Sequence, residues 1–328
     1  MRHYCTLFDR NYLSRGLALH GSLMRHGGDF RLFILCLDPP THCALAELAL
    51  PRVELIAAET LESWDAELRA ARSNRSAVEF YFTCKSVLLR YVLARSNGIA
   101  RLTYLDADLY FFSDPAPIEQ ESAPSAVTLT PHRFPAHVAY MNKRSGVYNA
   151  GWVGVSASAE GERFLEWWRA RCIEWCRLIF EETRFGDQKY LDQVPGLFRG
   201  VVSISHPGVN AAPWNIDGLR IAVAGKRVEI EGHPLIAFHF HGMKRVAPRL
   251  YDSGLFMYRA RLTRAARRHI FRPYLLELAR CDALVATLPA ELRRSITPAL
   301  ALSRGKGWAD HLRTVARIFA TRTALVGP

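Results

Sequence analysis

The sequence predicts an α/β fold in which a mixed sheet is flanked by helices. Expected strands and helices alternate through the first two-thirds of the 328-residue chain, a pattern typical of this class. The run FRLFILCLD at 30–38 is continuously apolar, as in a parallel strand covered on both faces. Residues 1–108 read β-α-β-α-β-α-α-β, which is typical of a nucleotide-binding half whose ligands bind at the carboxyl ends of the strands.

Hydrophobic periodicity and turn residues place the individual elements along the chain. Strands are expected at 3–9, 30–38, 52–58, 99–108, 125–131, 146–156, 201–205, 220–225, 228–232 and 234–242, with a Gly-Lys turn joining the two before the last. Helices are expected at 12–26, 61–72, 78–95 and 158–180, with a short helix after Pro39-Pro40. From about Val246 onward the chain is dense in arginine, and we expect a basic helical C-terminal region.

The composition is that of a globular protein with a surplus of positive charge. The chain has 43 basic and 31 acidic residues, a net charge of +12, which suits nucleic acid, anionic lipid or phosphorylated substrates. Seven scattered cysteines indicate reduced core thiols rather than a disulfide framework. The chain enters a strand at once and contains no apolar run of about 18 to 20 residues, so we expect a cytoplasmic protein, attached to a membrane surface at most.

Two aspartates stand where the apolar strand LTYL ends, in the stretch ARLTYLDADLYFFSDP. Asp106 and Asp108 are two residues apart, so both carboxylates can share one divalent cation. Carboxylate oxygens suit Mg²⁺ or Mn²⁺, and such a cation keeps positions open for a diphosphate. The alternative is a solvated turn without a ligand. The position at a carboxyl edge of the expected sheet favours the metal site.

A second polar group ends the expected strand 234–242. His239 and His241 are followed directly by Gly242, and Lys244 is nearby. A neutral imidazole can complete a carboxylate metal site, and a lysine beside it can neutralise phosphate. A histidine at a strand end can equally be an ordinary hydrogen-bonded polar residue.

Two further segments carry polar side chains at turns. In FGDQKYLD, Asp187 and Gln188 either cap the next helical turn or hold a sugar and polarise a reacting centre. In FDRNY, at the end of the first strand, Asp9 and Asn11 can hydrogen-bond a nucleobase or ribose, and Tyr12 can stack on a base. Each of these residues is also typical of turns.

Taken in order, these features resemble the GT-A glycosyltransferases, and particularly the glycosyltransferase family 8-like group. Within that group, the chain resembles a bacterial subgroup of nucleotide-diphospho-sugar transferases. The resemblance covers roughly residues 3–245. The matching motifs are Asp9-Arg10-Asn11-Tyr12, Asp106-Ala107-Asp108, Asn149-Ala150-Gly151, Asp187-Gln188 and His239-Phe240-His241-Gly242. The resemblance implies a GT-A catalytic domain at 1–245, divided into a nucleotide-binding half (1–108) and an acceptor and sugar half (109–245). Residues 246–328 would be a basic helical extension.

The resemblance also implies the roles of single residues. Asp106, Asp108 and His239, with His241 as its competitor, would hold Mn²⁺ or Mg²⁺, and the metal would bind a nucleotide-sugar diphosphate. Asp9, Asn11 and Tyr12 would lie near the base and ribose, Lys85 would face the donor, and Lys244 would approach the phosphates. Asn149 would lie around the donor sugar with the catalytic pair Asp187 and Gln188. A UDP-sugar is the favoured donor, and retention of configuration is favoured over inversion.

The acceptor side is less specified by the sequence. The segments TPHRF and GVNAAPWN place His132, Arg133, Trp214 and Asn215 where they could shape an acceptor pocket. A basic amphipathic segment can lie on an anionic membrane, where lipid-linked glycan acceptors are found. We therefore expect the acceptor to be a glycan or a lipid-linked glycan of surface-polysaccharide assembly. We also expect a location on the inner face of the cytoplasmic membrane. The arginines of that segment are Arg245, Arg249, Arg259, Arg261, Arg264, Arg267, Arg268 and Arg272.

Three other functions compete with this interpretation. A metal-dependent phosphohydrolase would use the same aspartate pair, but DADLYFF lacks the threonine of the common D-x-D-x-T motif. A nucleic-acid-binding protein would explain the positive charge, but no stacking aromatics interleave with the basic residues as in a recognisable module, so no nucleic acid partner is expected. A catalytically inactive nucleotide-sugar-binding protein would keep the same motifs.

Overall fold

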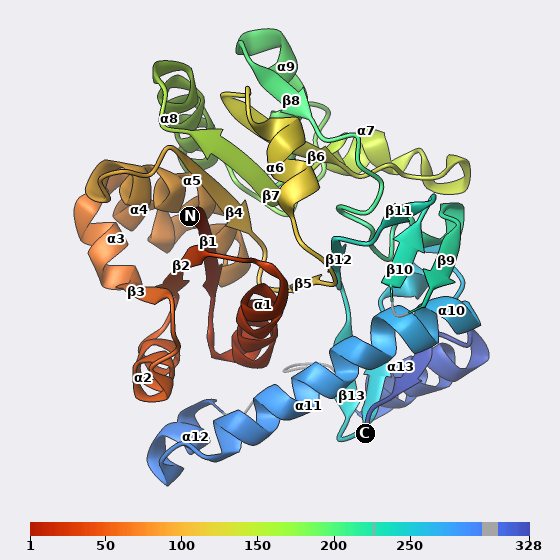
Figure 1. The fold of residues 1–328 in the computed structure, drawn as a ribbon. Helices are drawn as coiled ribbons and strands as arrows, with labels where there is room; N and C mark the ends of the chain where they lie inside the picture. Colours follow the sequence, from red (N-terminus) through yellow and green to blue (C-terminus); the bar gives the residue numbers. More distant parts are fainter. Residues whose placement is uncertain (226, 297–307) are drawn as a thin grey trace.

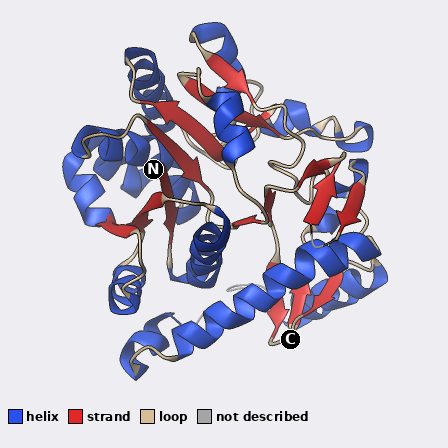
Figure 2. Cartoon of the chain, viewed as in Figure 1, coloured by secondary structure: helices blue, strands red, loops and turns tan. Residues whose placement is uncertain are grey.

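The computed structural model describes residues 1–225, 227–296 and 308–328. Strands gather at the centre of the molecule and helices surround them (Figures 1 and 2). The strands are β1 (Arg2–Phe8), β2 (Phe30–Cys36), β3 (Val53–Ala57), β4 (Arg101–Leu105), β5 (Leu109–Phe111), β6 (Val127–Pro131), β7 (Tyr148–Ser156), β8 (Val201–Ser203), β9 (Ile221–Ala224), β10 (Arg227–Ile230), β11 (His233–Pro234), β12 (Ala237–His239), β13 (Lys244–Ala247), β14 (Leu250–Asp252) and β15 (Ala324–Val326). The helices are α1 (Leu13–His26), α2 (Pro39–Leu48), α3 (Ala58–Trp64), α4 (Ala66–Ala71), α5 (Ala77–Arg95), α6 (Ala116–Ser122), α7 (Met141–Ser145), α8 (Ala159–Glu174), α9 (Val194–Leu197), α10 (Arg264–Ala266), α11 (Arg272–Ala286), α12 (Ala290–Ile296) and α13 (Trp308–Ala320).

The main sheet has seven strands in the order β3-β2-β1-β4-β7-β6-β8. Strands β3, β2, β1 and β4 are mutually parallel, whereas β7 runs antiparallel to both β4 and β6. The chain builds outward from β1 to β3 and then returns to place β4 on the other side of β1. This reversal makes the carboxyl edge between β1 and β4 a topological switch point, where ligands bind in open α/β sheets. The predicted α/β class with a mixed sheet is confirmed.

Side chains alternate between the two faces of the sheet because successive residues of a strand point in opposite directions. On β1, Tyr4 and Phe8 join a hydrophobic cluster with α1 and α11, whereas Cys5 and Leu7 join a second cluster with α5 and α8. Both faces are therefore covered, which explains the continuously apolar run of β2. All seven cysteines are free.

Smaller sheets complete the molecule beside the main one. Strand β5, directly after the aspartate pair, pairs antiparallel with β12, so that His239 lies opposite Leu109. Strands β13, β14 and β15 form another small sheet, which the sequence pattern did not predict. Helix α11 packs against α1 and leads to α12, which contacts α2 (Figure 1). In the part of the chain that the structure describes, no helix has the length and apolar character needed to cross a membrane.

Two of the expected helices have different bounds in the structure, and one expected turn is described only in part. The helix expected at 158–180 ends at Glu174, because Trp175 is extended and the next residues bond elsewhere. The Leu178 amide donates to the Glu79 carboxylate (2.9 Å). The helix expected at 61–72 is interrupted at Asp65, which ends α3 and caps α4. The expected turn at Gly225-Lys226 lies partly outside the described residues.

The expected strand 234–242 is also wrong as a single element. It is divided into β11 and β12, because the chain changes partners between them. The Leu235 amide donates to Val228, but the Ile236 and Ala237 amides donate to the Gly208 carbonyl. This change of partner carries the chain from the small β9–β11 sheet to β5. The strand therefore ends at His239, and His241 lies beyond it.

The Asp65 side chain provides a stability test in this part of the fold. It is buried, caps α4 and accepts from Arg169 of α8 at 2.5 and 2.7 Å. We expect Asp65→Asn to lower the free energy of unfolding by ~2 kcal/mol at pH 7, because Arg169 loses its buried partner. The loss is no larger because Glu67 still pairs with Arg169 at 2.7 Å. Urea denaturation measures this loss. Glu174→Gln, which removes an exposed pair on α8, should change it by less than ~0.5 kcal/mol.

The pH dependence of that effect has a definite sign. Burial would raise the pKa of Asp65, but the hydrogen bonds from Arg169 and from the Leu68 amide outweigh burial and lower it. A carboxyl with a lowered folded pKa stabilises the fold above its unfolded pKa, which is about 3.9, and loses that contribution as pH falls through the folded value. The difference between wild type and Asp65→Asn should therefore shrink below about pH 4. A difference that stays constant down to pH 3 would contradict this account.

Candidate functional site

The candidate site lies at the carboxyl edge of β4, where the aspartate pair follows the strand. The Leu109 amide donates to the Asp106 carbonyl (3.0 Å), which closes a tight turn. The Asp106 amide donates to the Gly151 carbonyl of β7 (2.8 Å), and this bond fixes the turn to the main sheet. The Phe240 amide donates to the Asp108 carbonyl (2.9 Å), and this bond brings the distant β12 segment beside the pair.

Pairing of β5 with β12 brings a histidine to the aspartates. His239 is buried, and its Nε2 lies 3.0 Å from Asp108 Oδ1 and 3.7 Å from Asp106 Oδ2. Asp108, His239 and His241 offer ligand atoms that all lie within 4.8 Å of one another. Within the described residues, neither ring nitrogen of His239 has a hydrogen bond of good geometry. Two carboxylates and a buried imidazole without hydrogen-bond partners fit a divalent cation such as Mn²⁺ or Mg²⁺.

The charges of this cluster shift the pKa values of its members. Burial would raise the pKa of Asp108, but the neighbouring His239 and, to a smaller extent, His241 and Arg15 outweigh it and hold the pKa well below its usual range. Burial would lower the pKa of His239, but the Asp108 carboxylate outweighs it and raises the pKa. Each group thus stabilises the charged form of the other, and a bound cation would replace the proton of His239 in this role.

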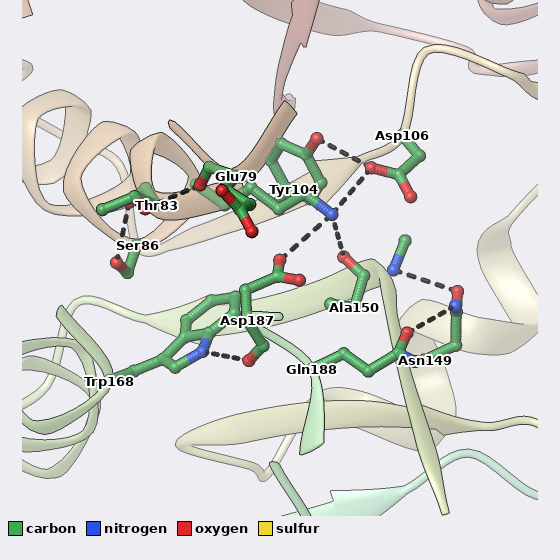
Figure 3. A network of polar contacts seen from close by, with 12 residues as sticks. Glu79, Thr83, Ser86, Tyr104, Asp106, Asn149, Ala150, Trp168, Asp187 and Gln188 are labelled. Atoms are coloured by element: carbon green, nitrogen blue, oxygen red, sulfur yellow. Dashed lines mark hydrogen bonds and ion pairs between the residues drawn. The ribbon is translucent and has the colours of Figure 1, made fainter. Parts of the chain in front are cut away.

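A buried lysine connects the aspartate pair to the Asp187 turn. Lys85 of α5 is buried, and its Nζ lies 3.0 Å from Asp106 Oδ1 and 3.2 Å from Asp187 Oδ2. The Tyr104 hydroxyl donates to Asp106 Oδ1 (2.8 Å) (Figure 3). Lys85 Nζ lies 3.5 Å from the Ala150 carbonyl. Burial would lower the pKa of Lys85, but Asp106 and Asp187 raise it, so the lysine is a fixed positive charge.

The amide of Gln188 is held in one orientation by its neighbours. His132 Nδ1 lies 3.2 Å from the Val147 carbonyl, so Nδ1 carries the proton and Nε2 is left to accept from Asn149 Nδ2 (3.4 Å). Asn149 Nδ2 also donates to Gln188 Oε1 (3.2 Å) (Figure 3). Gln188 Nε2 donates to the Ser145 carbonyl (2.8 Å). Burial lowers the pKa of His132 to about 3, so this orientation does not change near neutral pH.

Gly151 gives a test of how tightly the site is packed against β7. A Cβ at this position would lie 2.6 Å from Asn149 Oδ1, 2.6 Å from His239 Cε1 and 2.9 Å from Asp106 Oδ2. We expect Gly151→Ala to lower the free energy of unfolding by ~2 kcal/mol, since these side chains must move. Metal affinity should fall as well, because two of the displaced side chains are candidate ligands.

Titration calorimetry with Mn²⁺ and urea denaturation measure the two effects of Gly151→Ala. The matched control is Gly154→Ala on the same strand, where the nearest atom is the Thr128 Cβ at 3.1 Å. The control should cost stability through crowding and leave Mn²⁺ affinity unchanged. If the two variants bind Mn²⁺ with equal affinity, the Asp106 and His239 side chains that Gly151→Ala displaces do not hold the metal.

The FDRNY segment lies at the carboxyl end of the neighbouring strand, β1. Asp9 caps a short 3₁₀ turn by accepting from the Asn11 amide (3.0 Å) and also accepts from Asn11 Nδ2 (2.8 Å). The Tyr81 hydroxyl lies 3.4 Å from Asp9 Oδ2. The Tyr12 ring is half exposed and packs under the Arg15 guanidinium, 4.2 Å from the ring centroid. The expected turn role of Asp9 is thus present in the structure.

The segment after His239 places the remaining predicted residues. His241 is exposed, and the Trp214 ring centroid lies 5.1 Å from that of His239 and 5.6 Å from that of His241. Lys244 is exposed at the start of β13. Arg133 binds the carbonyls of Ile204, His206 and Val209, so it holds a loop of the protein itself.

The Trp214 indole and the Asn215 amide both donate to the His132 carbonyl, at 2.9 and 2.8 Å. Trp214 therefore fixes the backbone of His132 as well as packing against His239.

Sequence reasoning missed Tyr104, Tyr81 and Arg15 near the site. Tyr104 stands two residues before Asp106, so the period of a strand puts it on the same side, and this signal was available. Arg15 stands three residues after Tyr12, which puts both on one side of a helix, and this signal was also available. Tyr81 reaches Asp9 only through the packing of α5 against the sheet, which has no local signal.

Comparisons with known proteins give relatives of this chain in sequence and in fold. No protein-family model matches the chain. The uncharacterised protein YfnD of Bacillus subtilis strain 168 is 32% identical over 281 residues, which cover 85% of this chain and 89% of YfnD. The uncharacterised protein YfnF of the same strain is 34% identical over 251 residues, which cover 74% of this chain and 82% of YfnF.

Among solved structures, the galactosyltransferase LgtC in complex with donor and acceptor sugar analogues matches with a TM-score of 0.55 and 14% identity, over 89% of this chain and 99% of LgtC. The match confirms the predicted fold of the GT-A glycosyltransferase type. By its likeness to YfnD and YfnF in sequence, the chain belongs to the protein family of these two proteins.

Proposed function

We propose that the protein is a metal-dependent glycosyltransferase that moves a sugar from a nucleotide-diphosphate sugar to a glycan or lipid-linked acceptor. The observation that carries this proposal is the convergence of Asp106, Asp108 and His239 at the switch point of a GT-A type sheet. Open α/β sheets bind nucleotides at this edge, and this set of oxygen and imidazole ligands suits Mn²⁺ or Mg²⁺. The motif order that resembles glycosyltransferase family 8 supports a UDP-sugar as donor.

The charges near this edge support a diphosphate ligand. Asp106, Asp108 and Asp187 carry three negative charges, against which Lys85 and Arg15 carry two positive ones. The surplus of one negative charge attracts a divalent cation, and the cation then leaves a surplus of one positive charge. The diphosphate of a nucleotide-sugar carries two negative charges and is attracted by that surplus. The site is therefore complementary to a cation and a diphosphate together, and neither fits as well alone.

The reaction would proceed at the donor sugar held between these groups. The acceptor hydroxyl oxygen bonds to the anomeric carbon, the bond from that carbon to the diphosphate oxygen breaks, and its electron pair leaves with the diphosphate. The hydroxyl proton passes to the released phosphate oxygen. When bound, the divalent cation acts as a Lewis acid on the leaving diphosphate. Asp106, Asp108 and His239 would hold the cation, and Asn149 and Gln188 would orient the donor sugar.

The surroundings of Asp187 bear on whether the reaction retains or inverts the configuration at the anomeric carbon. Its Oδ2 lies 3.2 Å from Lys85 Nζ in a buried ion pair. Burial and the Asp106 charge raise its pKa, and Lys85 lowers it, with a net increase. A carboxylate occupied by a lysine is poorly placed to deprotonate an acceptor. This arrangement supports retention without a general base, in which Asp187 positions Lys85 and Gln188 acts beside the donor sugar.

The acceptor would reach the site along the C-terminal part of the molecule. We propose that residues 1–245 form the catalytic domain and that the basic extension at 246–328 lies on an anionic membrane surface. Exposed apolar side chains among its arginines support this placement. They are Phe256, Met257, Leu276, Leu284, Leu312 and Phe319. We expect the protein to co-sediment with phosphatidylglycerol vesicles and to be released from them by salt. Equal binding to neutral vesicles would contradict the proposal that the arginines bind the membrane through its negative charge.

Calorimetric binding of nucleotides tests the enzymatic proposal. UDP and GDP are titrated into the protein with Mn²⁺, with Mg²⁺ and with a chelator, and hydrolysis of a generic phosphate monoester is measured in parallel. We expect one nucleotide to bind in the presence of metal and to lose affinity when the chelator is added. Hydrolysis of the monoester without nucleotide binding would favour the phosphohydrolase. Failure of both nucleotides to bind under every metal condition would overturn the transferase proposal.

A further inference from the structure

Arg15 is the one basic residue of the first turn of α1, next to the candidate site. The residue is half-buried, and its Nη2 donates to the Met243 carbonyl (2.6 Å). Its guanidinium lies over the Tyr12 ring, 4.2 Å from the centroid. Among residues 1–225, 227–296 and 308–328, no carboxylate lies within ion-pair distance of it. The contact to Met243 leaves its other N–H donors available.

The position of this cation on its helix is electrostatically unfavourable. The first turn of a helix carries the positive end of the helix dipole, which favours acidic residues and disfavours basic ones. The first turn of α1 contains no acidic residue that would offset Arg15. Tyr12 and the Met243 carbonyl supply contacts but no negative charge. A partner for the guanidinium therefore has to come from outside the helix.

The nearby negative charge is the aspartate pair. Met243 stands two residues after His241 and four after His239, so the hydrogen bond that Arg15 donates to its carbonyl brings the guanidinium beside that segment. Asp108 lies 3.0 Å from His239 of the same segment, so its carboxylate belongs to the edge that Arg15 approaches. A cation bound by Asp108 would take up much of this carboxylate's charge. Arg15 would then face the metal site with no anion of the protein to balance it.

Three other cations near the site already have carboxylate partners. Lys85 is occupied by Asp106 and Asp187. On the segments before and after Arg15, Arg10 pairs with Asp38 at 2.7 Å and Arg25 pairs with Glu277 at 3.1 Å. Arg15 differs from all three because its contacts are neutral. A planar guanidinium with free N–H groups matches phosphate oxygens with two parallel hydrogen bonds.

We propose that Arg15 binds the diphosphate of the nucleotide-sugar donor. This inference rests on the proposed function and adds a donor-binding residue to it. Arg15 would hold phosphate oxygens from the α1 side, while the aspartate pair and His239 hold them through the cation. The Met243 carbonyl and the Tyr12 ring fix the guanidinium plane before the donor binds, so little side-chain entropy is lost on binding.

The rival role for Arg15 is structural: it would only tie α1 to the Met243 loop. The two roles differ in what they do to ligands of different charge. A phosphate contact affects a ligand that carries phosphates and leaves the nucleoside unaffected. A structural tether that fails would disturb both ligands alike, because the loop carries the histidines and packs near Tyr12.

The experiment measures UDP and uridine affinities, with Mn²⁺ present, for wild type, R15Q, R15K and R25Q. Calorimetry serves for UDP and NMR titration for uridine. We expect R15Q to weaken UDP binding about 10- to 100-fold, because a charge-assisted contact is lost, and to leave uridine binding unchanged. R15K keeps the charge without the planar fork and should lose less than R15Q. R25Q, on the same helix with its own carboxylate partner, should match wild type.

Each other outcome is decisive. If R15Q and R15K keep wild-type affinity for UDP, or lose UDP and uridine equally, this inference is overturned while the proposed function stands. If wild type itself binds neither UDP nor GDP under any metal condition, the proposed function is overturned and this inference with it. Thermal unfolding of each variant shows whether R15Q is folded, and R15K provides the same comparison if it is not.

Discussion

Replacement of Lys85 by methionine is expected to lower the free energy of unfolding by ~4 kcal/mol. Methionine keeps the length of the side chain but removes the charge that lies 3.0 Å from Asp106 and 3.2 Å from Asp187. Asp187 is buried, so without Lys85 its carboxylate would be left without a counterion in a low-dielectric environment. Removing one partner of a buried ion pair costs more than the pair itself contributes, because the other charge stays buried.

Urea denaturation of three variants measures this effect. Lys85→Met combined with Asp187→Asn removes the stranded charge as well and should recover at least ~1 kcal/mol relative to the single variant. Lys244→Met, at an exposed lysine, should change stability by less than ~0.5 kcal/mol. If the double variant is no more stable than Lys85→Met alone, the loss comes from packing around α5 rather than from the charge of Asp187.

The loss should be independent of pH through the neutral range. Burial would lower the pKa of Lys85, but Asp106 and then Asp187 outweigh it and raise the folded pKa above the unfolded value. A lysine with a raised folded pKa contributes its full stability below the unfolded pKa, which is about 10.4, and loses it only as pH rises through the folded value. Between pH 6 and 9 the difference between wild type and Lys85→Met should therefore be flat.

Much of the site could be predicted because it is built from strand ends. Asp9 and Asp106 follow strands that are neighbours in the sheet, and carboxyl ends of parallel strands share one edge. His239 was recognised by its place at the end of an apolar segment. In each case a local pattern of apolar residues followed by polar ones marks the end of a strand, and the rules of α/β topology then bring those ends together.

Other parts had no local signal. Strand β15 pairs with β14 across more than seventy residues, and a three-residue strand carries no periodicity of its own. The division of 234–242 depends on the Gly208 carbonyl, which the sequence of that segment does not reveal. Lys85 lies in a strongly apolar helix, and the resemblance placed it toward the donor, but its ion pairs with Asp106 and Asp187 become visible only after α5 packs on the sheet. Long-range pairing decides these features, and short windows of sequence do not contain it.

Asp108→Asn is expected to lower metal-dependent donor turnover by about 10²- to 10³-fold, because the asparagine keeps the shape of the side chain and loses the negative charge that the cation needs. The neighbouring Asp106 is a less clean target. It also pairs with Lys85 and accepts from Tyr104, so its replacement would mix a loss of stability with a loss of metal. Asp108 contacts His239 and is independent of Lys85 in the structure.

The measurements for Asp108→Asn are release of nucleotide diphosphate from a panel of donor sugars, Mn²⁺ affinity by calorimetry, and the unfolding midpoint. Asp114→Asn is the matched control, since Asp114 follows β5 closely, is exposed, forms an ion pair with Arg2 and accepts from the Ala116 amide, away from the candidate ligands. It should keep wild-type turnover. A folded Asp108→Asn that keeps turnover would contradict the metal role of this carboxylate. Loss of turnover together with loss of Mn²⁺ affinity, at an unchanged unfolding midpoint, would mean that Asp108 acts through the cation. A lower unfolding midpoint would mean that part of the loss comes through the fold, because Asp108 also pairs with the buried His239.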